Sequence, residues 1–280
     1  MLPNLVLIGA MKSGTTSLHY YLGLHPEISM SKPKEIDFFS IDNNWKKGIK
    51  WYESHFNKNT KVRGEASTSY TKHPEFPNVP ERMYSILPNA QLIYLLRDPV
   101  ERIISHYIQN YSAGREKRTF NKAMNIVNQN HYVNCSKYFY QLEQYLKYYN
   151  SSDIMIIPSY DLKYQRRRTL KKIFKALKVD ETFYCPEYSN VLHKSVDKKR
   201  KNVFGLILKY LHARLPINLK NILKKSLPDK VINNHKAFSR VSIEQPELDE
   251  KLKIDITNCI MDDILKLKKF TGIKFSDWCI

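Results

Sequence analysis

Residues 9–17 read GAMKSGTTS and hold two glycines, one lysine and four hydroxyl side chains within nine positions. Glycines permit a tight turn whose backbone N–H groups face an anion, while lysine and hydroxyl groups add charge and hydrogen-bond donors. The stretch approaches the phosphate loop G-x-x-x-x-G-K-[ST], but Thr15 and Thr16 follow the second glycine. It therefore predicts an anion-binding loop; the alternative is a plain glycine turn with an exposed lysine.

The position of the lysine narrows the choice of anion. In a Walker loop the lysine follows the second glycine and reaches the β- and γ-phosphates, and a strand-end aspartate helps to hold Mg²⁺. Here Lys12 lies inside the loop, and Asp98, between Arg97 and Pro99, is typical of a turn or a helix cap. The sequence therefore disfavours ATP–Mg²⁺ chemistry at this loop.

Alternating elements must position this loop. Short apolar runs that are typical of buried strands occupy residues 5–8, 61–66, 91–96 and 153–157. Patterns with helical spacing occupy residues 15–24, 99–111, 139–149, 170–177 and 248–264. This alternation predicts an α/β fold with a central parallel sheet flanked by helices. Residues 9–14, 65–69 and 97–98 should then meet beyond the carboxyl ends of the strands, where ligands of such sheets bind.

Composition sets the remaining limits. The 280 residues carry no linker or repeat, so we expect a single domain over residues 1–280, and no apolar run is long enough to span a bilayer. The four cysteines are widely spaced and predict neither a metal site nor a disulfide framework, which favours a cytoplasmic protein. The net charge of +19 favours an anionic partner, although a lysine-rich composition also produces a merely solvated basic surface.

Five stretches in order carry a family resemblance. LIGAMKSGTTSLHYYLGLHPEI resembles the 5′-phosphosulfate loop of sulfotransferases that use 3′-phosphoadenosine 5′-phosphosulfate (PAPS), and LIYLLRDPVERIISHY is similar to their 3′-phosphate segment. KPKEIDFFS, GEASTSY and VPERMYSILPNAQ point to the glycan sulfotransferases of the heparan type and their bacterial relatives. The resemblance covers residues 4–112 well and the rest loosely. It implies a P-loop-like three-layer fold, PAPS as co-substrate and no required metal.

The resemblance also implies donor-binding residues. Those around the 5′-phosphosulfate are Lys12, Ser13, Gly14, Thr15 and Thr16. Those around the 3′-phosphate are Arg97 and Ser105, although an ion pair between Arg97 and Glu101 is an equally simple reading of the segment. A loop over residues 188–202 should close on the nucleotide, with candidate contacts from Ser195, Lys198, Lys199 and Arg200, or else form a solvated basic face.

Catalytic roles follow from the same comparison. Glu35 aligns with the glutamate that glycan-type enzymes use as base, and Lys12 is placed to stabilise the leaving phosphate; charge balance and ground-state binding are the alternatives. Asp37 and Ala66 stand where heparan-type enzymes often have histidine and lysine. We expect the function to be transfer of a sulfuryl group to a hydroxyl group. A carbohydrate, which can be polyanionic, is the first expectation for the acceptor. The alternatives are a nucleotide kinase or NTPase and a basic nucleic-acid-binding protein.

Overall fold

The computed structural model describes residues 1–56, 58–190, 199–201, 240–242 and 245–280. Contacts group the chain into two compact units, of which the first comprises residues 1–103, 124–193 and 248–280. The second comprises residues 104–123 and 194–247. The expectation of a single domain over the whole chain stays a prediction.

The first unit is built on a five-stranded, all-parallel sheet with the strand order β2-β3-β1-β4-β5. Its strands are β1 (Leu5–Gly9), β2 (Ile28–Met30), β3 (Val62–Ala66), β4 (Gln91–Leu96) and β5 (Ile154–Pro158). Every residue of β1 is buried, as expected for a strand covered on both faces. Because the connections run in opposite directions on the two sides of β1, the carboxyl end of this strand is the expected ligand position.

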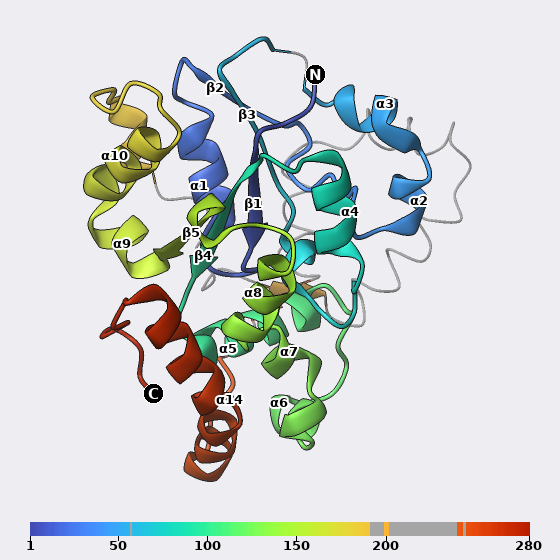
Figure 1. Ribbon diagram of the computed structural model, residues 1–280. Helices are drawn as coiled ribbons and strands as arrows, with labels where there is room; N and C mark the ends of the chain where they lie inside the picture. The colour runs from blue at the N-terminus through green and yellow to red at the C-terminus, as the bar shows by residue number, and fades with distance from the viewer. Residues whose placement is uncertain (57, 191–198, 202–239, 243–244) are drawn as a thin grey trace, which may run out of the picture. The chain divides into compact units, whose positions relative to one another are not determined.

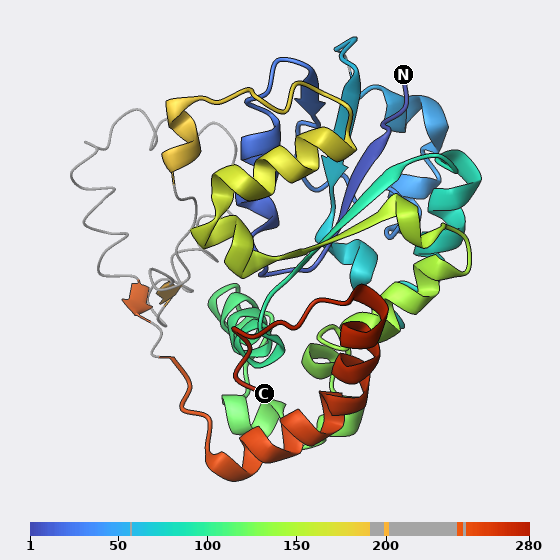
Figure 2. The same cartoon turned by 60° about the vertical axis from the view of Figure 1, so that its left-hand side comes forward.

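Helices cover both faces of this sheet. On one face lie α1 (Thr15–Leu22), α9 (Ser159–Tyr164) and α10 (Arg166–Ala176), and on the other α4 (Val79–Ile86) and α8 (Tyr138–Leu146) (Figures 1 and 2). Leu18 of α1 and Phe174 of α10 belong to one apolar cluster with Leu7 and Leu95 of the sheet. The predicted P-loop-like three-layer α/β fold is thus confirmed.

Shorter elements complete the described part of the first unit. They are α2 (Asp42–Trp45), α3 (Gly48–Glu53), η1 (Thr68–Thr71), η2 (Val127–Gln129), α7 (His131–Asn134), η3 (Ser151–Asp153) and η4 (Pro186–Ser189). The last helix is α14 (Glu250–Thr271), which Asp249 caps by accepting the N–H of Leu252 at 2.7 Å.

The second unit contains few described elements. α5 (Pro99–Ser112) begins in the first unit and ends in the second, which also holds α6 (Phe120–Ala123). β6 (Lys199–Lys201) and β7 (Arg240–Ser242) pair antiparallel in a separate two-stranded sheet. None of the helices in the described ranges has the length and apolar content needed to cross a membrane.

Candidate active site

The glycine loop follows the carboxyl end of the central strand β1. A Cβ atom on Gly9 would lie 2.1 Å from Oγ1 of Thr71 and 3.2 Å from a ring carbon of Tyr94, so only glycine fits at this point. On the other side of the loop Gly14 has a φ of 100°, a left-handed conformation that favours glycine. The two glycines therefore fix the path of the loop that carries Lys12.

The loop ends on an uncapped helix terminus. Gly14 is the N-cap of α1, where no side chain accepts an N–H group, and the first turn of α1 contains no acidic residue. The first N–H groups of a helix have no acceptor within the helix, and their partial positive charge favours an anion. The N-terminus of α1 has these donors, and Thr15 and Thr16 add hydroxyl groups beside them.

Lys12 and Ser13 lie in the turn before this terminus. Lys12 has a φ of 74°, which is uncommon for a residue with a side chain. Ser13 is 2% exposed, and its N–H donates to the carbonyl of Ala10 at 3.1 Å. Its hydroxyl lies near the phenol of Tyr138 but makes no hydrogen bond of ordinary geometry to a described residue. The turn thus combines a cation with a buried hydroxyl group behind the helix N-terminus.

The segments after β3 and β4 meet this loop at the same sheet edge. Thr71, in η1 after β3, donates its hydroxyl to the carbonyl of Ile8 at 3.2 Å. On the other side Ala10 donates its N–H to the carbonyl of Leu95, near the end of β4, at 2.8 Å. The parallel sheet thus brings the carboxyl ends of β1, β3 and β4 to one edge, and the meeting of residues 65–69 and 97–98 with the loop itself stays a prediction.

Glu35 is held against the segment after β3. Its Oε2 accepts the N–H of Thr68 at 2.7 Å and the Thr68 hydroxyl at 3.3 Å, and its Oε1 is paired with Lys34. The Glu35 side chain is 41% exposed, so solvent or a substrate reaches the carboxylate. Glu35 is thus fixed at the sheet edge that carries the loop, and its ion pair with Lys34 matches the charge-balancing alternative.

Asp37 is held beside Glu35 by hydroxyl groups. Its N–H donates to Oγ of Ser67 at 3.0 Å, and its Oδ1 accepts the hydroxyl of Ser69 at 2.5 Å. Burial raises the pKa of Asp37, the hydrogen bond from Ser69 opposes that rise, and the negative charge of Glu35 adds to it. Ser67 and Ser69 belong to the hydroxyl-rich run that follows the predicted strand over residues 61–66, and this run is the sequence pattern that could have indicated their contacts with Asp37.

Glu65 is a second carboxyl group of this edge and is fully buried. Its Oε1 accepts the phenol hydroxyl of Tyr52 at 2.9 Å. Burial raises the pKa of Glu65 to about 8, and the phenols of Tyr70 and Tyr52 oppose that rise only in part. At neutral pH Glu65 is therefore mostly protonated, and the sequence did not indicate this state.

Arg97 follows β4 and is paired with Glu101. Its Nε and an Nη donate to Oε2 of Glu101 at 2.8 and 2.6 Å, with side chains 30% and 56% exposed. This is the ion pair that the sequence offered as the alternative. An exposed i,i+4 pair is worth about 0.3–0.5 kcal/mol, so an incoming phosphate can compete for the guanidinium.

Asp98 serves as a structural cap. Its Oδ1 accepts the N–H of Glu101 at 2.9 Å, and its Oδ2 accepts the N–H of Cys279 at 2.7 Å. The neighbouring Arg102 is fully buried, and its Nε donates to Oγ of Ser136 at 2.6 Å. The sequence did not indicate this burial. Asp98 is thus a helix cap, as predicted, and is occupied by protein donors.

The remaining predicted donor residues belong to the second unit or lie outside the described residues. Ser105 is buried on α5 and belongs to the second unit, so its joint role with Arg97 stays a prediction. Ser195 and Lys198 lie outside the described residues, and Lys199 and Arg200 lie in β6. Their predicted contacts with the nucleotide also stay predictions.

Comparison with known proteins identifies the family. The model of the sulfotransferase domain family matches residues 2–204 of the 280. The chain belongs to the sulfotransferase family. The match includes the glycine loop, Glu35 and the segment from Arg97 to Ser105, so the predicted family is confirmed.

Individual sulfotransferases match parts of the chain. Membrane-associated sulfotransferase kil1 of Dictyostelium discoideum is 47% identical over 111 residues, which cover 38% of this chain and 22% of that protein. Heparan sulfate glucosamine 3-O-sulfotransferase 5 of Mus musculus is 33% identical over 168 residues, which cover 56% of this chain and 47% of that protein. The chain therefore spans less than half the length of these curated relatives.

One solved sulfotransferase has a similar fold. It is the sulfotransferase from Alicyclobacillus acidocaldarius, with a TM-score of 0.68, 20% sequence identity and coverage of 99% of both chains. At this identity the likeness is one of fold, and it agrees with the parallel sheet and its flanking helices.

Proposed function

We propose that this sulfotransferase moves the sulfuryl group of PAPS to a hydroxyl group of a carbohydrate. The observation that carries the proposal is the loop of residues 9–14, which delivers Lys12 and an uncapped, acid-free helix N-terminus at the carboxyl end of β1. Membership of the sulfotransferase family supports the reading of this loop as a phosphosulfate site.

In the proposed reaction the donor binds with its phosphosulfate on the loop. The N–H groups at the start of α1, the hydroxyls of Ser13, Thr15 and Thr16 and the ammonium of Lys12 then surround the anion. As the acceptor oxygen bonds to sulfur, the bond from sulfur to the bridging phosphate oxygen breaks. Lys12 and the helix terminus stabilise the negative charge that develops on that oxygen.

The acceptor proton goes to Glu35. Hydrogen bonds from Thr68 orient one carboxylate oxygen, and the 41% exposure of the side chain leaves the group open to an acceptor. Asp37 and Ala66 stand where heparan-type enzymes often have histidine and lysine. The acceptor contacts that those enzymes make at these two positions therefore do not transfer to this chain. Relatives are named as heparan sulfate enzymes, which supports a carbohydrate as the acceptor class.

The donor part of the proposal is tested by ligand-dependent thermal stability. The wild-type chain is heated with 3′-phosphoadenosine 5′-phosphate (PAP), with ATP–Mg²⁺, or with a single-stranded oligonucleotide. Only a ligand that binds the native state raises the midpoint, and the rise grows with ligand concentration. We expect PAP to give the largest rise. A rise with ATP–Mg²⁺ or oligonucleotide and none with PAP would favour the kinase or nucleic-acid alternative.

A further inference from the structure

α10 presents a cationic face whose side chains form no ion pair with a described residue. The helix Arg166–Ala176 contains six basic residues and no acidic residue. At 100° per residue one arc of the helix carries five of them, which are exposed: Arg167, Arg168, Lys171, Lys172 and Lys175. Thr169, Leu170, Ile173 and Phe174 lie on the opposite side and are buried.

The spacing of these cations makes them repel one another. Like charges four residues apart on a helix destabilise it, and three such pairs occur: Arg167 with Lys171, Arg168 with Lys172, and Lys171 with Lys175. None of the five forms an ion pair with a described residue. An external anion would relieve this repulsion.

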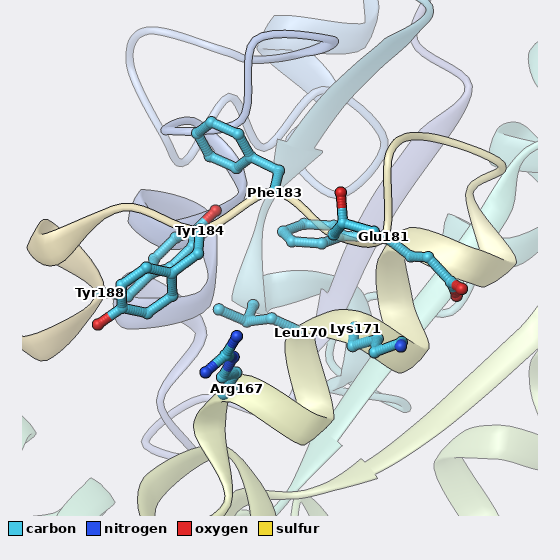
Figure 3. Close-up of a pocket in the computed structure, with 9 residues that line it drawn as sticks. Arg167, Leu170, Lys171, Glu181, Phe183, Tyr184 and Tyr188 are labelled. Atoms are coloured by element: carbon cyan, nitrogen blue, oxygen red, sulfur yellow. The ribbon is translucent and has the colours of Figure 1, made fainter.

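A pocket of about 190 Å³ adjoins the cationic face (Figure 3). Arg167 and Lys171 of α10 line it, together with Glu181, Tyr184 and Tyr188 from the segment that follows the helix. In Figure 3 Glu181 and Lys171 lie on one side of the pocket, and Arg167 and the two tyrosines lie on the other. A cavity of about 150 Å³ holds benzene, so this pocket has room for a six-membered ring.

The polar groups of the pocket have unused hydrogen-bonding capacity. Oε2 of Glu181 is buried and has no hydrogen-bond partner among the described residues, and the buried hydroxyl of Tyr188 lies beside the thiol of Cys185 with no oxygen or nitrogen partner there. The guanidinium of Arg167 lies over the ring of Tyr184 at 5.3 Å from its centroid. Buried polar atoms without partners call for a ligand or a water, and aromatic rings offer apolar contact area to a ring.

We propose that this pocket and the face of α10 bind an acidic carbohydrate that bears sulfate or carboxylate groups. Arg167 and Lys171 would hold an anionic group, the tyrosines would contact the sugar ring, and Glu181 would accept sugar hydroxyls. Glu181 favours a carbohydrate over a phosphodiester backbone, because an ionised carboxylate only accepts hydrogen bonds, and sugar hydroxyls supply donors whereas the phosphodiester groups supply none. The site goes beyond the proposed function, because binding here requires neither donor nor turnover.

The test measures binding of a fluorescently labelled, fully sulfated heparin octasaccharide by anisotropy, with no donor present. The double variant Arg167→Ala/Lys171→Ala should bind at least tenfold more weakly than wild type. The matched control Lys46→Ala/Lys50→Ala removes two exposed cations from another part of the first unit and should bind within twofold of wild type. Circular dichroism checks that each variant is folded. Equal losses in the two double variants would show charge attraction alone and overturn the proposal.

Glu181→Gln separates the carbohydrate from other anions. Loss of the carboxylate should weaken octasaccharide binding several-fold, because sugar hydroxyls lose an ionised acceptor. Stronger binding by Glu181→Gln would show that the carboxylate only repels the ligand and would overturn the proposal. Binding of phosphatidylserine vesicles or an oligonucleotide with the same response to Arg167→Ala/Lys171→Ala would overturn it as well.

Saturating PAP distinguishes this site from the proposed donor site. PAP should not displace the octasaccharide, because Arg167, Lys171 and Glu181 lie outside the glycine loop and outside the 188–202 segment that is expected to close on the nucleotide. Competition by PAP would assign the octasaccharide to the donor site and contradict the separate pocket. The result is independent of whether the chain transfers a sulfuryl group.

Discussion

At the scale of single residues, the raised pKa of Glu65 predicts how the stability of the folded chain depends on pH. Burial raises this pKa to about 8 from 4.5, so within that window the folded chain keeps a proton that the unfolded chain has lost. The contribution of Glu65 to the free energy of unfolding is fully present below about pH 4.5 and is lost as the pH rises towards 8. The slope is at most about 1.4 kcal/mol per pH unit.

Glu65→Gln should remove this pH dependence. Glutamine resembles the protonated carboxyl group and can accept from Tyr52, so the variant should be closer to wild type at pH 5 and more stable than wild type at pH 8. Urea unfolding at pH 5, 6, 7 and 8 measures both free energies. The exposed control Glu247→Gln should follow the wild-type profile. Parallel profiles for Glu65→Gln and wild type would mean that Glu65 is ionised in the fold.

The ion pair of Arg97 with Glu101 allows a paired test of the 3′-phosphate site. Arg97→Ala should weaken PAP binding about 10- to 100-fold, the range for loss of hydrogen bonds to a charged group. Glu101→Gln frees the guanidinium and should strengthen binding about twofold, because the exposed pair is weak. Isothermal titration calorimetry measures both constants. Tighter binding by Arg97→Ala would remove Arg97 from the donor site.

At the scale of elements, the turn from β1 into the glycine loop depends on the absence of a side chain at Gly9. In Gly9→Ala the new Cβ would meet Thr71 and Tyr94, neighbours from η1 and β4, so one of these segments must shift. We expect a loss of about 3 kcal/mol in the free energy of unfolding, together with weaker PAP binding.

Gly23→Ala is the matched control for this change. Gly23 ends α1 with a φ of −68°, and its nearest atom to a new Cβ would lie at 3.4 Å, so alanine should cost little there. Urea unfolding compares the two variants. Equal stabilities for Gly9→Ala and Gly23→Ala would contradict the packing described between β1 and the segment after β3.

The elements also show what the sequence could predict. β1 was predictable because four apolar residues precede a glycine, and α14 because apolar residues recur at helical spacing. β2, Ile28–Met30, was not predicted, since three residues carry too little pattern and the strand exists through its pairing with β3. Tertiary contacts supply what local pattern lacks.

The candidate site also combines features that a local sequence pattern predicts with features that depend on tertiary contacts. The glycine loop could be predicted from the sequence because all its groups lie within nine consecutive residues. The hydrogen bond from Thr68 to Glu35 joins residues 33 positions apart, so no local pattern reveals it. The protonated state of Glu65 depends on complete burial, which is a property of the packed sheet edge.

At the scale of the whole molecule, the net charge of +19 should oppose folding through repulsion among exposed cations. Raising the ionic strength from about 0.01 to 0.1 M shortens the Debye length from about 30 to 10 Å and should raise the thermal midpoint by several degrees. Sodium chloride and sodium acetate at equal ionic strength should give the same shift if screening is the cause. No shift with either salt would show that the charges are locally balanced.

The most direct test of the proposed function is transfer of ³⁵S-labelled sulfate from PAPS to a panel of polysaccharides. Wild-type chain should label at least one carbohydrate. Glu35→Gln should bind PAP with wild-type affinity but label that carbohydrate at least about 100-fold more slowly, because the acceptor proton has no base. Folded, PAP-binding wild type that labels no carbohydrate, or equal labelling by Glu35→Gln, would contradict the proposed reaction.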